Sequence, residues 1–325
     1  MSSTHGSAIL GVDVGGTKVA VGIVDGDGRI ITHGRKPMIA NGTAEAGFEA
    51  VTTAIDSMIS GAPGGFQSIG ICAPGPLDPK TGIVLNPPNL PCWRNFPLAD
   101  RVAGKYHVPV KVDNDANAAA LAETRWGAAR GFHYVFYATV GTGIGAGIVF
   151  DNKIYHGKTG SAAEGGHQSI DYRGPVCACG KKGCIEILAA GPAIGARARA
   201  KLSAEPSRHS VILDLANGNI SSVTSELVGK AYAAGDLVAK EALLETVELL
   251  TAWLGNVVDM LDPDVLVMGG GVAAMLRPFF EEIKRGLPKW CVNPRVSEIP
   301  LLMAHYGADA GIAGGAALCS EDTSS

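Results

Sequence analysis

The chain has 325 residues, a formal net charge of −4 and a sequence pI near 6.1. This length predicts two domains with ample core, and the mild acidity excludes the basic surface typical of proteins that bind nucleic acid or anionic membranes. No apolar run is long enough to span a bilayer. The 44 glycines fall in short clusters after apolar runs, where α/β enzymes build ligand loops. We therefore expect a cytoplasmic α/β protein without nucleic-acid or membrane partners.

The first motif is a glycine-rich turn between two expected strands, 8–14 and 19–24. Its polar and glycine residues are Asp13, Gly15, Gly16, Thr17 and Lys18. A P-loop reads G-x4-G-K-[ST] and precedes a helix, whereas here threonine precedes lysine and a further strand, 29–34, follows. The backbone N–H groups and the hydroxyl can still hold a phosphate, and the aspartate can hold magnesium. A plain Gly-Gly turn is the alternative.

The next part of the chain predicts a helix, a strand, a long loop, a short helix and a strand. These elements are expected over 44–59, 67–72, 81–97, 97–106 and 108–112. Loops as long as the third of these are often functional. Asn89 lies in that loop, where it either binds a ligand or forms a turn.

Two aspartates and two asparagines, Asp113, Asn114, Asp115 and Asn117, follow the last of these strands. An alanine-rich helix is expected from 116 to 126. Asp115 can cap this helix. Alternatively, a carboxylate at the carboxyl end of a strand can accept a proton from a bound hydroxyl group. The spacing leaves both interpretations open.

A second glycine-rich turn follows an expected strand over 134–140. It begins with Gly141, Thr142 and Gly143 and contains a weak match to the dinucleotide fingerprint. A strand, 148–150, a turn and another strand follow instead of the helix that this fingerprint needs. Two Gly/Thr hairpins of the same kind could hold a phosphate chain, which favours ATP over NAD.

The segment 164–186 concentrates metal-ligand side chains. Three of the seven cysteines, Cys177, Cys179 and Cys184, lie there with His167, which is a complete ligand set for a structural zinc site. A disulfide, a redox pair or chance are the alternatives, although the spacing C-x-C-x4-C lacks a C-x-x-C pair. The spacing alone does not fix His167 as the fourth ligand. A metal here would fix two neighbouring carboxylates, Glu164 and Glu186.

The C-terminal part reads as helices with two strands between them. Helices are expected over 185–201 (with Pro192 kinking it or starting a second helix), 221–233, 237–261, 275–286 and 307–318, and strands over 265–268 and 296–303. Gly269, Gly270 and Gly271 follow the first of these strands. They leave room for an adenine ring to lie against the backbone, or they form a tight turn.

Together these motifs resemble the ROK family of sugar kinases, over about residues 9–318 and most closely in its bacterial glucokinase branch. The most specific match is E-G-G-H at 164–167 followed by C-A-C-G-K-K-G-C-I-E at 177–186, and D-V-G-G-T-K and V-D-N-D-A-N support it. The resemblance implies an actin-like, hexokinase-like (ribonuclease H-like) α/β fold of two domains with a cleft between them. We expect a small domain of residues 8–113 plus 305–319 and a large domain of residues 114–304.

The resemblance also implies roles for individual residues. Asp115 corresponds to the catalytic base. The implied sugar contacts are Gly75, Asn89, Asn114, Asp115, Glu164, His167 and Glu186. The implied ATP and phosphate contacts are Asp13, Gly15, Gly16, Thr17, Lys18, Gly141, Thr142, Gly143, Gly270 and Gly271. The implied zinc ligands are His167, Cys177, Cys179 and Cys184.

The activity that follows is phosphorylation of a hexose at its 6-hydroxyl by ATP and magnesium, with structural zinc. Glucose is the implied substrate. The alternatives are fructose, N-acetylmannosamine or N-acetylglucosamine, or a sugar sensor without turnover. Only about seven residues precede the first expected strand, so we expect no DNA-reading helix-turn-helix. The expected assembly is a homodimer.

Overall fold

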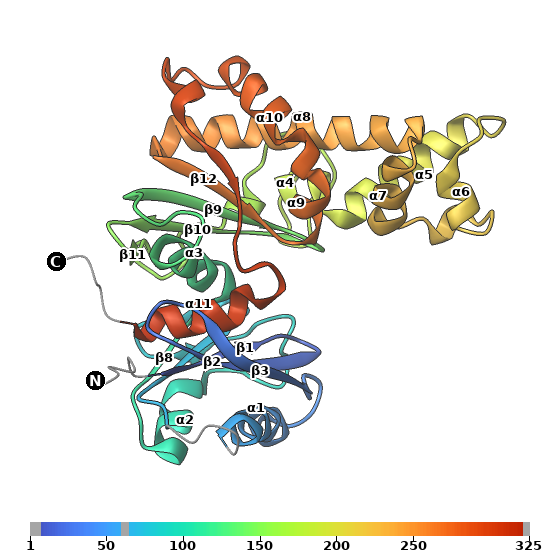
Figure 1. Cartoon of the computed structure of the whole chain (residues 1–325). Coiled ribbons are helices and arrows are strands. Elements are labelled where there is room, and N and C mark those ends of the chain that lie inside the picture. The colour runs from blue at the N-terminus through green and yellow to red at the C-terminus, as the bar shows by residue number, and fades with distance from the viewer. Residues whose placement is uncertain (1–7, 60–64, 321–325) are drawn as a thin grey trace. The chain divides into compact units, whose positions relative to one another are not determined.

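The computed structural model describes residues 8–59 and 65–320, and its contacts divide the chain into two compact units (Figure 1). The first unit comprises the described residues up to Tyr137, the segment Gly147–Ala163 and the described residues from His305 onward. The second unit comprises Ala138–Ala146 and Glu164–Ala304. Among the described helices, none combines the length and apolar character that crossing a bilayer requires.

The first unit is built on a mixed sheet with the strand order β3-β2-β1-β4-β8. The strands are β1 (Ile9–Val14), β2 (Lys18–Val24), β3 (Ile30–Pro37), β4 (Ile69–Ala73) and β8 (Val110–Asn114). The first three form antiparallel hairpins, whereas β4 pairs in parallel with both β1 and β8. The carboxyl ends of β1, β4 and β8 therefore share one edge of the sheet.

Helices cover both faces of this sheet (Figure 1). The helices α1 (Ala44–Ile59) and α2 (Leu98–Tyr106) pack on one face, and α11 (Ala310–Cys319) packs on the other. Glycines in the strands let α11 approach closely, because a Cβ atom at Gly11 or Gly70 would overlap a carbonyl oxygen of that helix. The small-residue helix expected at 307–318 is thus confirmed, with a 3₁₀ turn over Gly307–Asp309 before it.

The segment expected to be a loop over 81–97 holds part of a small sheet, so that prediction was incomplete. Its strands are β5 (Leu77–Asp78), β6 (Ile83–Val84) and β7 (Phe96–Pro97), in that order. Trp93 is fully buried and stacks on Phe96, with ring centroids 4.9 Å apart. Strands of two residues carry no periodic pattern, which is why the sequence did not reveal them.

A second sheet has the order β11-β10-β9-β12-β13. Its strands are β9 (Tyr134–Val140), β10 (Ile144–Phe150), β11 (Lys153–Ile154), β12 (Val265–Gly269) and β13 (Leu301–Met303). The division between the units passes through β9 and β10. The strand expected over 296–303 is confirmed only in its second half, because Val296–Glu298 forms a 3₁₀ turn.

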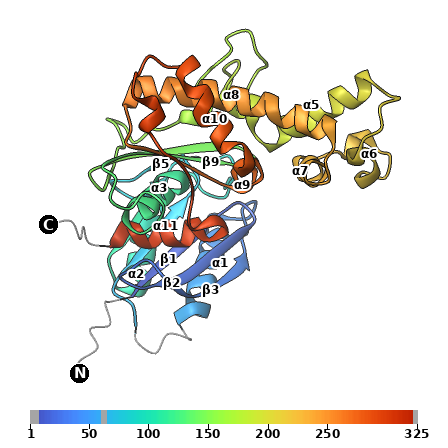
Figure 2. The ribbon, with the colours of Figure 1, turned by 45° about the horizontal axis from the view of Figure 1, so that its top comes forward.

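The second unit is rich in helices, and α5, α6 and α7 gather at one end of the long helix α8 (Figures 1 and 2). The helices are α4 (Ile185–Ala189), α5 (Gly191–Ala204), α6 (Val211–Leu215), α7 (Ser225–Ala233), α8 (Leu237–Leu261), α9 (Gly271–Leu276) and α10 (Phe280–Gly286). Pro192 starts a second helix rather than kinking one, since proline fits the first turn, where its missing N–H costs nothing. The helix expected over 275–286 is likewise two helices.

The observed units differ from the expected domains in where residues 114–137 and 147–163 belong. Both segments group with the first unit. The physical reason lies in α3 (Asp115–Arg125), which packs against α11. Gly314 of α11 lies so close to Ala118 of α3 that a Cβ atom on the glycine would be 2.8 Å from the Ala118 carbonyl carbon.

Candidate active site

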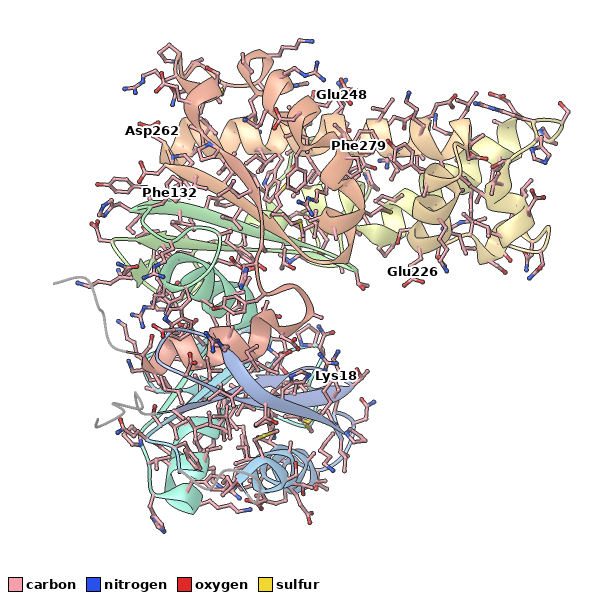
Figure 3. The ribbon with its side chains drawn as sticks, viewed as in Figure 1. Lys18, Phe132, Glu226, Glu248, Asp262 and Phe279 are labelled. Atoms are coloured by element: carbon pink, nitrogen blue, oxygen red, sulfur yellow. The ribbon has the colours of Figure 1, made fainter. Side chains whose placement is uncertain are left out.

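The first Gly/Thr hairpin connects β1 and β2 as the sequence predicts. The Gly15 N–H donates to the Lys18 carbonyl oxygen at 2.9 Å and closes the turn, which leaves Thr17 and Lys18 exposed. Lys18 projects from the start of β2 (Figure 3). A Cβ atom on Gly16 would come within 2.7 Å of the Asn89 carbonyl oxygen. The absence of a side chain therefore lets the hairpin lie against Asn89, and an expected phosphate loop meets an expected sugar contact.

Asp13 is the second-last residue of β1, beside this hairpin, and its surroundings disfavour the ionised form of its carboxyl group. Burial and, after it, the negative charge of Asp115 raise the pKa of Asp13 from 3.8 to about 6, against the opposing effect of Lys18 and Arg35. Two carboxylates that repel each other in this way favour a cation between them. Magnesium prefers such oxygen ligands, so the pair fits the expected metal.

Asp115 is the first residue of α3, and its carboxyl group is exposed. The helix cap is Asn114, whose Oδ1 accepts from the backbone N–H groups of Ala116 (2.9 Å) and Asn117 (3.3 Å). The interpretation of Asp115 as a simple cap was therefore wrong. Its Oδ1 accepts from the Ala116 N–H at 2.8 Å, so the carboxyl group is held at the start of the helix and is not its cap.

Gly75 lies next to Asn114, because a Cβ atom at Gly75 would be 3.6 Å from the Asn114 Nδ2. The peptide bond from Gly75 to Pro76 is cis. In the first unit, the hairpin contacts Asn89, and Gly75 contacts Asn114. Asp13 and Asp115 interact through their charges. These are the residues that the sequence assigned to phosphate, magnesium and the reacting hydroxyl group.

The second unit holds the Cys/His cluster. The ligand atoms of His167, Cys177, Cys179 and Cys184 all lie within 4.8 Å of one another. The Cys179 and Cys184 sulfurs are 3.6 Å apart, and the Cys177 sulfur is 3.7 Å from the His167 Nδ1. A zinc–sulfur bond of about 2.3 Å places tetrahedral ligand atoms about 3.8 Å apart. The geometry of the four side chains therefore fits a tetrahedral metal.

The chemistry of the three thiols also fits a cation. A hydrogen bond from the backbone of Lys181 lowers the pKa of the exposed Cys179, whereas burial raises that of Cys184 to about 12. Besides burial, the neighbouring thiols raise the pKa of Cys184 and so disfavour its ionisation without a cation. A divalent ion favours the thiolate form of each and would be held by four protein ligands, with no position left for a reactive water.

Glu186 links this cluster to the second Gly/Thr hairpin. Its Oε2 accepts from the Ile144 backbone N–H at 2.9 Å, and its Oε1 lies 3.9 Å from the His167 Nδ1. A Cβ atom on Gly143 would come within 2.6 Å of Oε2. A side chain at position 143 would therefore displace the Glu186 carboxylate from its present place.

Glu164 begins the 3₁₀ turn Gly165–His167, and its carbonyl oxygen accepts from the His167 N–H at 3.0 Å. Its side chain is exposed. Gly166 in this turn is buried against the carbonyl oxygen of Ile144. The turn therefore keeps Glu164 and His167 together beside the second hairpin, as the motif predicts.

A cavity of about 1210 Å³ opens in the second unit. Of the expected nucleotide contacts in this unit, Gly141, Thr142 and Gly271 line it, whereas Gly143 and Gly270 do not. The sequence did not identify the lining from α5 and α7, which includes Gly191, Gly195, Arg199, Glu226, Gly229 and Tyr232. Glu226 lies near the start of α7 (Figure 3). Glycines four residues apart on α5 were the available signal, since they leave one helix face bare.

The hairpins, the carboxylate pair and the cavity together define a phosphate-handling α/β protein of the sugar-kinase class. The model of the ROK family matches residues 9–322. A glucokinase of Streptomyces coelicolor is 33% identical over 315 residues, which cover 96% of this chain and 97% of that protein. An N-acetylmannosamine kinase of Citrobacter koseri is 30% identical over 96% of this chain and 99% of its own.

A solved structure agrees with these relatives. The crystal structure of a ROK family glucokinase from Streptomyces griseus in complex with glucose and AMPPNP matches with a TM-score of 0.82 and 35% identity, over 96% of this chain and 99% of that chain. The chain therefore belongs to the ROK family. The expected actin-like, hexokinase-like fold is confirmed.

Proposed function

We propose that this protein is an ATP-dependent glucokinase that converts glucose to glucose 6-phosphate. The observation that carries the proposal is the pair of Asp13 and Asp115, two interacting carboxyl groups beside a glycine-rich hairpin. One carboxylate that holds a cation and one that accepts a proton are the two charges that phosphoryl transfer from ATP needs. The similarity to the two glucokinases supports glucose as the acceptor.

Asp115 is the proposed general base. Its carboxylate accepts the proton of the 6-hydroxyl group as that oxygen attacks the γ-phosphorus, the bond to the β–γ bridging oxygen breaks, and ADP leaves. Asp13 would hold magnesium, directly or through water. When bound, this ion would neutralise part of the negative charge of the phosphates. The N–H group of Gly16 and the hydroxyl of Thr17 hold phosphate oxygens, whereas the Gly15 N–H keeps the turn closed through its bond to the Lys18 carbonyl oxygen. General-base catalysis of this kind is worth about 10²–10⁴-fold in rate.

Each unit holds its own group of proposed sugar contacts. Asn89, Asn114 and the backbone at Gly75 belong to the first, and Glu164, His167 and Glu186 belong to the second. The Nδ1 atom of His167 faces the cysteine sulfurs, so its Nε2 is left to bind a sugar hydroxyl. We propose that structural zinc on His167, Cys177, Cys179 and Cys184 orients this ring and, through it, Glu186.

The proposed site for adenosine is the cavity between the second hairpin, α5, α7 and α9. Thr142 at one border suits the phosphates, and Gly271 with Val272 and Met275 offers apolar contact to the ring. Gly191, Gly195 and Gly229 also line the cavity and place no side chains in it. The nucleotide contacts at Gly143 and Gly270 stay predictions. The cytoplasmic location and the homodimer also stay predictions. Light scattering on a size-exclusion column tests the homodimer.

The alternative acceptor is another hexose, and the similarity to an N-acetylmannosamine kinase is the observation that favours it. A few pocket contacts decide such choices. The deciding experiment measures ADP release with magnesium-ATP and glucose, fructose, N-acetylmannosamine or N-acetylglucosamine. The highest kcat/KM with glucose supports the proposal. A preference for one of the others identifies a different kinase, and no ADP release with any sugar that nonetheless binds identifies a sensor.

A further inference from the structure

Asp113, two residues before the proposed base, is held by a histidine from a distant part of the chain. His156 follows β11, and its Nε2 lies 2.6 Å from Oδ2 of Asp113, near the end of β8. The Asp113 side chain is only 5% exposed, and that of His156 is 31% exposed. Both residues belong to the first unit. Neither residue is among the sugar, phosphate or metal contacts described above.

The other oxygen of Asp113 holds the backbone and helix that carry the base. Its Oδ1 accepts from the Asn114 N–H at 2.7 Å and from the Asn117 Nδ2 at 3.2 Å. Asn117 is buried, and its own Oδ1 has no hydrogen-bond partner among the described residues. Its amide is therefore oriented by the bond that it donates to Asp113. One carboxylate thus connects His156, the strand end and the first turn of α3.

A carboxylate this deeply buried needs a partner that carries positive charge or strong donors. A separation of 2.6 Å is typical of a charge-assisted hydrogen bond, which is about twice as strong as a neutral one. His156 supplies this bond from outside the sheet. Removing it would leave Asp113 with backbone and amide donors alone, so the carboxyl group would turn toward water and release Asn114 or Asn117.

We propose that His156 is a positioning residue for the base Asp115, acting through Asp113. The ring holds the Asp113 carboxyl, the carboxyl holds the Asn114 N–H and the Asn117 amide, and these hold Asp115 between them. A displacement of about 1 Å at a reacting group can cost about 10²-fold in rate. This inference depends on the proposed function only for its kinetic readout.

The chain offers a matched control in a second His–Asp pair of the same unit. His133 Nδ1 lies 3.0 Å from Asp151 Oδ1, but both side chains are 69% exposed. Exposed pairs contribute little to stability or to position. His133→Ala is therefore expected to leave every measured property of the enzyme unchanged.

The experiment compares His156→Ala, His156→Gln and His133→Ala in the full chain. Amide hydrogen exchange of residues 110–118 is measured first, and kcat and KM for magnesium-ATP and glucose second, below the unfolding temperature. We expect faster exchange at Asn114 and Asp115 and a loss of kcat of about 10-fold or more in His156→Ala, with KM for ATP within about 2-fold of wild type. Because Gln retains an N–H donor, His156→Gln should recover most of both properties.

The outcomes separate the inference from the proposed function. Unchanged exchange and unchanged kcat in His156→Ala would overturn the inference, as would an equal loss of kcat in His133→Ala. If His156→Ala does not fold, His156→Gln decides, and turnover in that variant at or below a hundredth of the wild-type rate would also overturn it. If the wild-type chain phosphorylates no sugar, the proposed function fails, and hydrogen exchange still tests the contact.

Discussion

The pKa of Asp13 predicts that this residue destabilises the folded protein at neutral pH. The pKa of its carboxyl group is 3.8 in the unfolded chain and about 6 in the fold. The folded state therefore binds more protons than the unfolded state between these values, and stability falls as pH rises through about 6. A tenfold difference in proton affinity corresponds to about 1.4 kcal/mol, so the cost above pH 6 is up to about 3 kcal/mol.

Asp13→Asn removes the buried charge and should therefore stabilise the protein in the absence of magnesium. At pH 8 we expect the melting temperature to rise by several degrees, since about 1 kcal/mol corresponds to roughly 2–4 °C for a domain of this size. At pH 4 most of this difference should disappear, because Asp13 is protonated in the folded protein and already partly protonated in the unfolded chain. The same variant should lose kinase activity, which is the usual trade-off between stability and function at an active site.

Differential scanning calorimetry at pH 4 and pH 8, with magnesium chelated, measures this effect. Asp27→Asn, an exposed turn residue of the same unit, serves as the control and should show no pH-dependent gain. An Asp13→Asn protein that is no more stable than wild type at pH 8, or whose gain is the same at both pH values, would refute the electrostatic reasoning.

Three further predictions address the metal cluster and the nucleotide. Cys179→Ser should lose zinc in atomic emission measurements and weaken glucose binding by about 10–100-fold, while an ATP analogue still binds; normal glucose affinity without zinc would contradict it. Gly229→Leu should fill the nucleotide cavity, since a Cβ atom there already meets the flexible end of Met275, and should weaken ATP-analogue binding about 10-fold or more with glucose binding unchanged. Isothermal titration should detect the ATP analogue and no NAD, and tight NAD binding would overturn the assignment of the hairpins.

Much of the fold could be predicted because its elements have strong local signals. The helices over 44–59 and 237–261 have the predicted bounds, and so does the strand over 134–140. The hairpin context of both glycine-rich turns, which excluded a P-loop and a dinucleotide fold, is also confirmed. In each case the apolar period or the turn residues lie within one short stretch of chain.

The remaining features depend on contacts between distant segments. Whether Asp115 or its neighbour caps α3 is decided by backbone angles at Asn114, which local composition does not specify. The cavity lining from α5 and α7 depends on how those helices pack, and α6 and the two-residue strands are too short for a periodic signal. The link between His156 and Asp113 spans 43 residues, so no motif contains both.

The central claim is that Asp115 accepts the proton while glucose attacks ATP. The measurement that tests it most directly is ADP release by wild type and Asp115→Asn with magnesium-ATP, with and without glucose, together with glucose affinity by titration. We predict glucose-dependent ADP release by the wild type and a kcat at least about 10²-fold lower in the variant, with glucose affinity changed little, because Asn keeps the shape but accepts no proton. Turnover of Asp115→Asn near the wild-type rate would contradict the assignment of the base.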